Sequence, residues 1–107
     1  MRKDAQLAIN EEVEKAINDF IDADFVMCNT VRLRTCTARV TDYGYYKVLM
    51  SYGTIVAFID TRTDTLYDIL RKVYGYTSTS AQHIFKFEKD YCAGKWNCAE
   101  RLTWREV

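Results

Sequence analysis

The sequence predicts a single α+β domain spanning residues 1–107: an antiparallel meander sheet of about five strands, an N-terminal helix, a C-terminal helix and a last strand at the C-terminus. Three observations predict this arrangement. An apolar stripe with helical spacing lies near the N-terminus. Short apolar runs separated by tight polar turns follow it. The length of 107 residues is that of one ordinary domain.

The first helix is predicted from an apolar stripe that recurs every three or four residues. Its members are Ile9, Val13, Ala16, Ile17, Phe20 and Ile21. Either Asp4 or Asn10 could cap its start, because both side chains accept hydrogen bonds from the backbone of a first helical turn. Residues 1–24 hold three basic and seven acidic residues, so we expect this helix to dock on the more basic remainder of the chain.

The strands are predicted from apolar, β-branched runs bounded by turn residues. The expected strands cover residues 31–40, 45–51, 54–59 and 65–70, with turns at 42–44, 52–53 and 60–64. The apolar phase shifts by one residue near Thr35, which favours a bulge or a strand buried on both faces.

The second helix is predicted over residues 80–92, because several hydroxyl side chains precede an apolar-periodic segment and can cap it. Gly94 is the expected C-cap of this helix. The alternation of residue types over 97–107 predicts the last strand.

Composition narrows the function classes. Lys+Arg and Asp+Glu each number 15, which argues against a globally basic nucleic-acid binder and against a strongly acidic nucleic-acid mimic. The sequence shows neither an uninterrupted apolar signal segment nor about 20 apolar residues in a row. We therefore expect a cytoplasmic protein with no membrane partner, whose four cysteines (Cys28, Cys36, Cys92 and Cys98) are thiols.

Catalytic and metal chemistry are not predicted. The cysteine spacings are wider than the two to four residues typical of structural zinc sites, so we expect neither a metal nor a cofactor. His83 is the one histidine and would be the base of any nucleophilic site, with Ser78 and Ser80 nearby in sequence. No phosphate loop or nucleophile elbow accompanies it, and the prediction is that the protein is not an enzyme.

A basic strand next to aromatic residues is the strongest sign of nucleic-acid binding. Arg32, Arg34 and Arg39 share one predicted strand, and Lys47 lies on its neighbour. Tyrosines at positions 43, 45 and 46 are close in sequence and could stack bases. This pattern supports the alternative function, a sheet module that binds single-stranded nucleic acid.

Two segments resemble known proteins. Residues 51–57 read Ser-Tyr-Gly-Thr-Ile-Val-Ala, and residues 78–84 read Ser-Thr-Ser-Ala-Gln-His-Ile. Together with the tyrosine-rich connection between them, they resemble small phage and mobile-element proteins that have a SYxTxVA strand and a TTSxHI-like helix start. The resemblance covers residues 45–90. It implies a non-enzymatic protein that binds and inhibits a host protein, such as a defence nuclease complex, by surface occlusion in the manner of anti-CRISPR proteins.

Tyrosine and arginine side chains dominate protein-binding hot spots, so we expect the partner-binding residues to be of these types. The predicted set is Tyr45, Tyr46, Tyr52, Tyr74, Tyr76, Arg32 and Arg34. A homodimer is the third alternative, formed through an edge strand or through the tail that carries Trp96 and Trp104.

Overall fold

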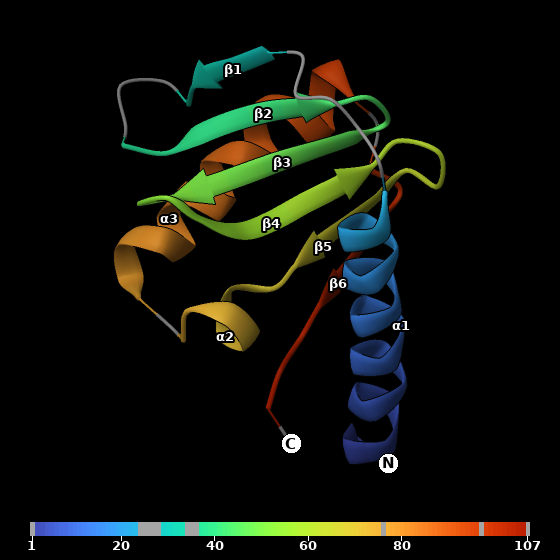
Figure 1. The fold of residues 1–107 in the computed structure, drawn as a ribbon. Helices are drawn as coiled ribbons and strands as arrows, with labels where there is room; N and C mark the ends of the chain where they lie inside the picture. Colours follow the sequence, from blue (N-terminus) through green and yellow to red (C-terminus); the bar gives the residue numbers. More distant parts are fainter. Residues whose placement is uncertain (1, 24–28, 34–36, 76, 97, 107) are drawn as a thin grey trace.

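The computed structural model describes residues 2–23, 29–33, 37–75, 77–96 and 98–106. In chain order these residues form α1 (Arg2–Asp22), β1 (Asn29–Arg32), β2 (Arg39–Tyr43), β3 (Tyr46–Ser51), β4 (Thr54–Asp60), β5 (Thr65–Asp68), α2 (Leu70–Val73), α3 (Ser78–Phe87), the π-helix η1 (Glu88–Lys95) and β6 (Glu100–Thr103). The predicted α+β class, with a helix at each end of the sheet segment and a last strand, is confirmed (Figure 1).

The strands form one six-stranded sheet in the order in which they occur in the chain. Pairs from β1 to β5 are antiparallel, as the predicted meander requires, whereas β6 runs parallel to β5. A parallel neighbour needs a long crossover connection, and α2, α3 and η1 supply it.

The sheet has six strands because the segment predicted as one strand, residues 31–40, is a hairpin. β1 and β2 pair with Arg32 opposite Arg39, and Leu33 donates a hydrogen bond to Ala38. The bulge or doubly buried strand expected near Thr35 falls between these two antiparallel strands. Residue 35 itself lies outside the described residues.

Each face of the sheet packs against a different helix. On the α3 face, strand residues including Val40, Leu49, Ile59 and Leu66 pack with Ile84 and Phe87 of α3. On the α1 face, Tyr46, Val48, Phe58 and Leu102 pack with Val13 of α1. The result is a central sheet between α1 and the α3–η1 segment (Figure 1).

The attachment of α1 depends on two side-chain amides. Asn10, only 5% exposed, donates to the carbonyl of Arg105 at 2.6 Å and accepts from the Arg105 N–H at 3.0 Å. Gln6 donates both to the Asn10 side chain, at 2.8 Å, and to the carbonyl of Thr103. The helix begins at Arg2, so Asn10 does not cap it but ties it to the C-terminal segment.

The predicted turn and cap signals are mostly confirmed. The β3–β4 turn is the two-residue loop Tyr52-Gly53, with φ values of 53° and 82°, the left-handed pair typical of a type I′ hairpin. The N-cap of α3 is Thr77, whose side chain accepts from the N–H of Ser80 at 3.2 Å. The second helical segment does not stop before Gly94, because η1 continues to Lys95.

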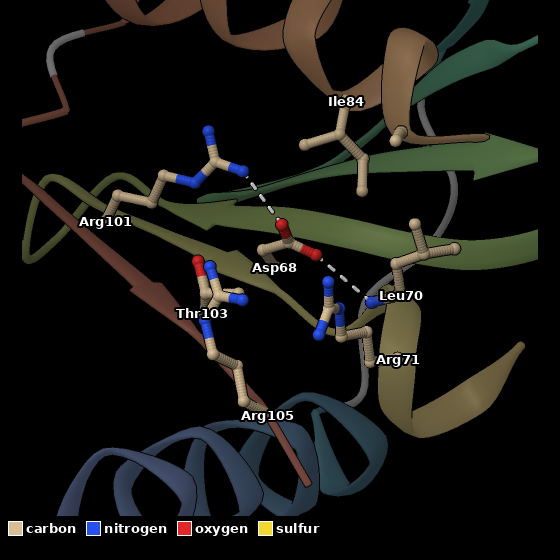
Figure 2. Close-up of a pocket in the computed structure, with 8 residues that line it drawn as sticks. Asp68, Leu70, Arg71, Ile84, Arg101, Thr103 and Arg105 are labelled. Carbon is tan, nitrogen blue, oxygen red and sulfur yellow. Dashed lines mark hydrogen bonds and ion pairs between the residues drawn. The ribbon is translucent and has the colours of Figure 1, made fainter. Parts of the chain in front are cut away.

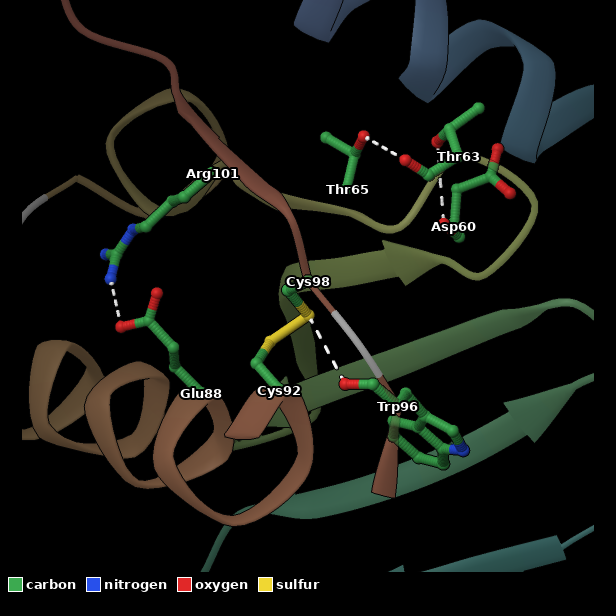
Figure 3. Close-up of a disulfide and its surroundings, with 8 residues drawn as sticks. All are labelled: Asp60, Thr63, Thr65, Glu88, Cys92, Trp96, Cys98 and Arg101. Atoms are coloured by element: carbon green, nitrogen blue, oxygen red, sulfur yellow. Dashed lines mark hydrogen bonds and ion pairs between the residues drawn. A yellow bond between two sulfur atoms is a disulfide. The ribbon is translucent and has the colours of Figure 1, made fainter. Parts of the chain in front are cut away.

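The prediction of four thiols is wrong for two of the cysteines. Cys92 and Cys98 are joined by a disulfide that links η1 to the segment before β6 (Figure 3). The chain turns back at the end of η1, which brings the two Cα atoms to 4.9 Å, within the range that a disulfide spans. Cys28 and Cys36 lie outside the described residues.

Candidate functional site

The structure does not bring the predicted binding residues together in one patch. Tyr45 and Tyr46 lie at the β2–β3 turn, and Tyr52 lies at the other end of β3, in the β3–β4 turn. Tyr74 follows α2. Arg34 and Tyr76 fall outside the described residues.

Tyr45 and Tyr46 belong to an internal cluster. Tyr46 is 1% exposed and packs against Phe20 and Phe58, and burial raises its pKa to about 12. The Arg62 guanidinium lies 3.7 Å from the centre of the Tyr45 ring and donates to the Tyr46 hydroxyl. Such contacts hold the two rings in place, so they do not form an open stacking platform.

Arg62 is held over these rings by a carboxylate that the sequence did not single out for this role. Asp60, at the end of β4, accepts two hydrogen bonds from the Arg62 guanidinium, at 3.0 and 2.8 Å, and one from its backbone N–H. This carboxylate raises the pKa of Arg62 above its ordinary value. Asp60 was predicted to start the turn over residues 60–64. It does so, and it also anchors Arg62.

Tyr52 and Tyr74 are exposed and differ in their surroundings. Tyr52 is 56% exposed, and its ring contacts that of His83, with the centroids 5.8 Å apart. Tyr74 directly follows Val73, an exposed apolar residue of α2. Both tyrosines are accessible to a partner.

The predicted basic strand is divided between the two faces of the sheet. Lys47 lies on the α3 face, where it forms an ion pair with Asp42 at 2.6 Å and approaches the ring of Trp96. Arg39 lies on the α1 face, because it is the cross-strand neighbour of Met50. The interpretation of these basic residues as one continuous face is therefore wrong.

Two arginines remain together on the α1 face. Arg32 of β1 lies directly opposite Arg39 of β2, and both are exposed. Leu33 hydrogen-bonds to Ala38 next to them, so the arginines occupy the neighbouring position in which cross-strand side chains come closest. Neither guanidinium has an ion-pair partner among the described residues. Like charges directly opposite each other are destabilising, and an anionic group bound between them would relieve the repulsion.

This arginine pair adjoins an apolar groove. The cross-strand row continues from Arg39 to Met50 of β3 and Ile55 of β4, which line a cavity of about 430 Å³ between α1 and the sheet. Ile21 and Val73 form its outer walls and are 69% and 44% exposed. Ile21 belongs to the apolar stripe predicted for the first helix, yet its side chain is left exposed in α1.

His83 forms a closed network that the sequence did not predict. Its Nδ1 lies 2.9 Å from the Ser51 hydroxyl, which is also 3.0 Å from the Ser80 hydroxyl. Ser51 and Ser80 are fully buried and His83 is 4% exposed. Burial, together with the charge of Lys86, lowers the pKa of His83. The network links the end of β3 to α3 and is closed to a substrate in this structure.

In the described part of the chain, no three or more His, Cys, Asp or Glu side chains are grouped so that they could hold a metal ion, and no helix is long and apolar enough to cross a membrane. In comparisons with known proteins, no protein-family model, no curated protein and no solved structure matches the chain. The groove and the arginine pair are therefore the features of this structure that bear on function.

Proposed function

We propose that this protein is a non-enzymatic binding protein that docks a segment of a host protein in the groove of the α1 face and inhibits that protein by covering its surface. The observation that carries the proposal is the continuity of an exposed apolar groove with two arginines that lack ion-pair partners among the described residues. The occupant we propose is a protein segment with apolar side chains for the groove and a carboxylate for the arginine pair.

Charge and distance support this choice of occupant. Neighbouring strands lie about 5 Å apart, so Arg39 is one strand and Arg32 two strands from Met50 at the edge of the groove. A carboxylate can accept a bidentate hydrogen bond from a guanidinium, and apolar side chains gain about 25 cal/mol for each Å² removed from water. Tyr74 follows Val73 at the groove wall and would extend the contact, as expected of a hot-spot residue.

The resemblance to small phage and mobile-element proteins supports an anti-defence role of the anti-CRISPR type in the cytoplasm of the host cell. A standard interface buries roughly 800 Å² per partner, which a domain of this size can supply.

The test is an affinity capture from host lysate, with and without nuclease, using the wild type and two groove variants. Ile21→Ser removes an exposed apolar wall, and the double variant Arg32→Glu with Arg39→Glu reverses the charge of the rim. Leu7→Ser and Lys89→Glu are matched controls, because both residues are exposed and neither lines the groove.

The proposal predicts that one host protein is retained after nuclease treatment by the wild type and both controls. Each groove variant should lose it, with affinity reduced about tenfold or more. Equal retention by all variants would contradict the groove as the binding site. Recovery of nucleic acid alone, lost at high salt, would instead favour the nucleic-acid alternative, since phosphate contacts release counterions.

A further inference from the structure

A second cavity, separate from the groove, is lined by three arginines. Its volume is about 150 Å³, and Arg71 of α2, Arg101 of β6 and Arg105 of the C-terminal segment contribute to its walls. In Figure 2 the side chains of the three arginines point toward the same space beside Asp68. Asp68 contributes the one negative charge in this lining, against the three positive charges of the arginines.

The frame of this cavity is already hydrogen-bonded. Asp68 accepts from Arg101 at 2.8 Å through one carboxylate oxygen and from the N–H of Leu70 at 3.2 Å through the other. Arg101 also donates to Glu88, from outside the cavity, at 2.8 Å. Asp68 and Glu88 thus engage Arg101 and leave its position well defined.

Arg105 is positioned through its backbone. Asn10 of α1 binds both the N–H and the carbonyl of Arg105, which fixes the backbone from which the Arg105 side chain extends. No described residue forms an ion pair with the Arg105 guanidinium. A guanidinium that extends from a fixed backbone near two other cations, without a carboxylate of its own, is arranged to receive an anion.

We propose that this cavity binds the phosphate group of a phosphate monoester, with Arg71 and Arg105 as the binding cations and Arg101 as the framework. The planar guanidinium matches the oxygens of phosphate bidentately. An apolar cavity of about 150 Å³ holds a molecule as large as benzene, so a five-atom phosphate group fits in this one. Leu70 and Ile84 form apolar walls, which strengthen the interaction by lowering the local dielectric constant.

The test is isothermal titration calorimetry with inorganic phosphate and with phenyl phosphate, at constant ionic strength held by sodium chloride. The variants are Arg105→Gln and Arg71→Gln. Lys89→Gln is the matched control, because Lys89 is an exposed cation that neither lines this cavity nor belongs to the groove. Circular dichroism melting of every variant without ligand verifies that each one folds.

The expected result is saturable binding by the wild type and the control, and a dissociation constant about tenfold higher or more in each cavity variant. Tighter binding of phenyl phosphate identifies an organic phosphate as the ligand, whereas equal binding identifies free phosphate. The proposal is overturned if tens of millimolar phosphate gives no saturation, or if Lys89→Gln weakens binding as much as Arg105→Gln. The groove variants leave this site intact, so the two proposals fail independently.

Discussion

Replacing Asn10 by alanine tests whether the side-chain amide of this residue holds α1 to the C-terminal segment. The substitution removes three hydrogen bonds from a side chain that is 5% exposed: two to the backbone of Arg105, at 2.6 and 3.0 Å, and one from the half-buried Gln6 amide, at 2.8 Å. Each bond contributes about 0.5–1.5 kcal/mol net, and more where a buried partner is left unsatisfied. Alanine regains about 0.6 kcal/mol through its higher helix propensity. The free energy of unfolding should therefore fall by roughly 1.5–2.5 kcal/mol.

The assay is urea denaturation followed by circular dichroism, with Asn18→Ala as the matched control. Asn18 is exposed on the same helix, so its replacement should raise stability by about half a kcal/mol through propensity alone. The two asparagine variants are thus expected to differ in sign. Hydrogen exchange should also show that α1 loses more protection than β3 in the Asn10 variant. An Asn10→Ala protein as stable as the wild type would refute the reasoning.

Three further predictions concern the other side of the sheet and its turn. Burial lowers the pKa of His83 from 6.5, so on acidification the unfolded chain binds the proton before the folded one does. The free energy of unfolding should therefore fall as pH drops below about 6.5. His83→Gln should flatten this pH dependence in urea titrations at several pH values, and an unchanged slope would contradict the prediction. Reduction of the Cys92–Cys98 disulfide, which closes a short loop, should lower stability by about 2 kcal/mol, and a variant with both cysteines replaced by serine should not respond to dithiothreitol in thermal melts. Tyr52→Asn should raise stability by about 0.5–1 kcal/mol, because asparagine adopts the positive φ of this turn position at lower cost. A lower melting temperature would show that the contact of the Tyr52 ring with His83 contributes more than the positive φ of Tyr52 costs.

The parts of the fold that were predictable are those written in local sequence. The helical period of the first apolar stripe, the Tyr52-Gly53 turn and the hydroxyl cap of the second helix are short-range signals, and all three form. The cap lies at Thr77, so α3 begins at Ser78, two residues before the predicted start at Ser80. Local signals misled where a tertiary contact decided the outcome. Asn10 has the residue type of a helix cap, yet it lies inside α1. There its side-chain amide hydrogen-bonds the N–H and the carbonyl of Arg105 in the C-terminal segment.

The candidate site was less predictable than the fold. Tyr46 is of a residue type common in binding hot spots but is buried, while Ile21 is of a type common in cores but is 69% exposed. Residue type cannot distinguish these cases, since both side chains are largely apolar. Each lies on a strand or helix whose successive side chains face the core and the solvent in turn. The position of α1 over the sheet decides which side chains it covers.

By itself, the sequence determined the α+β class, the helix at each end of the sheet segment and the turns between consecutive strands, because periodicity and turn chemistry act over a few residues. Only the tertiary structure decided that β6 runs parallel to β5, that Arg32 faces Arg39 and that Arg71, Arg101 and Arg105 converge. These relations join residues far apart in the chain or depend on strand register, and register is set by packing of the whole sheet rather than by any single segment.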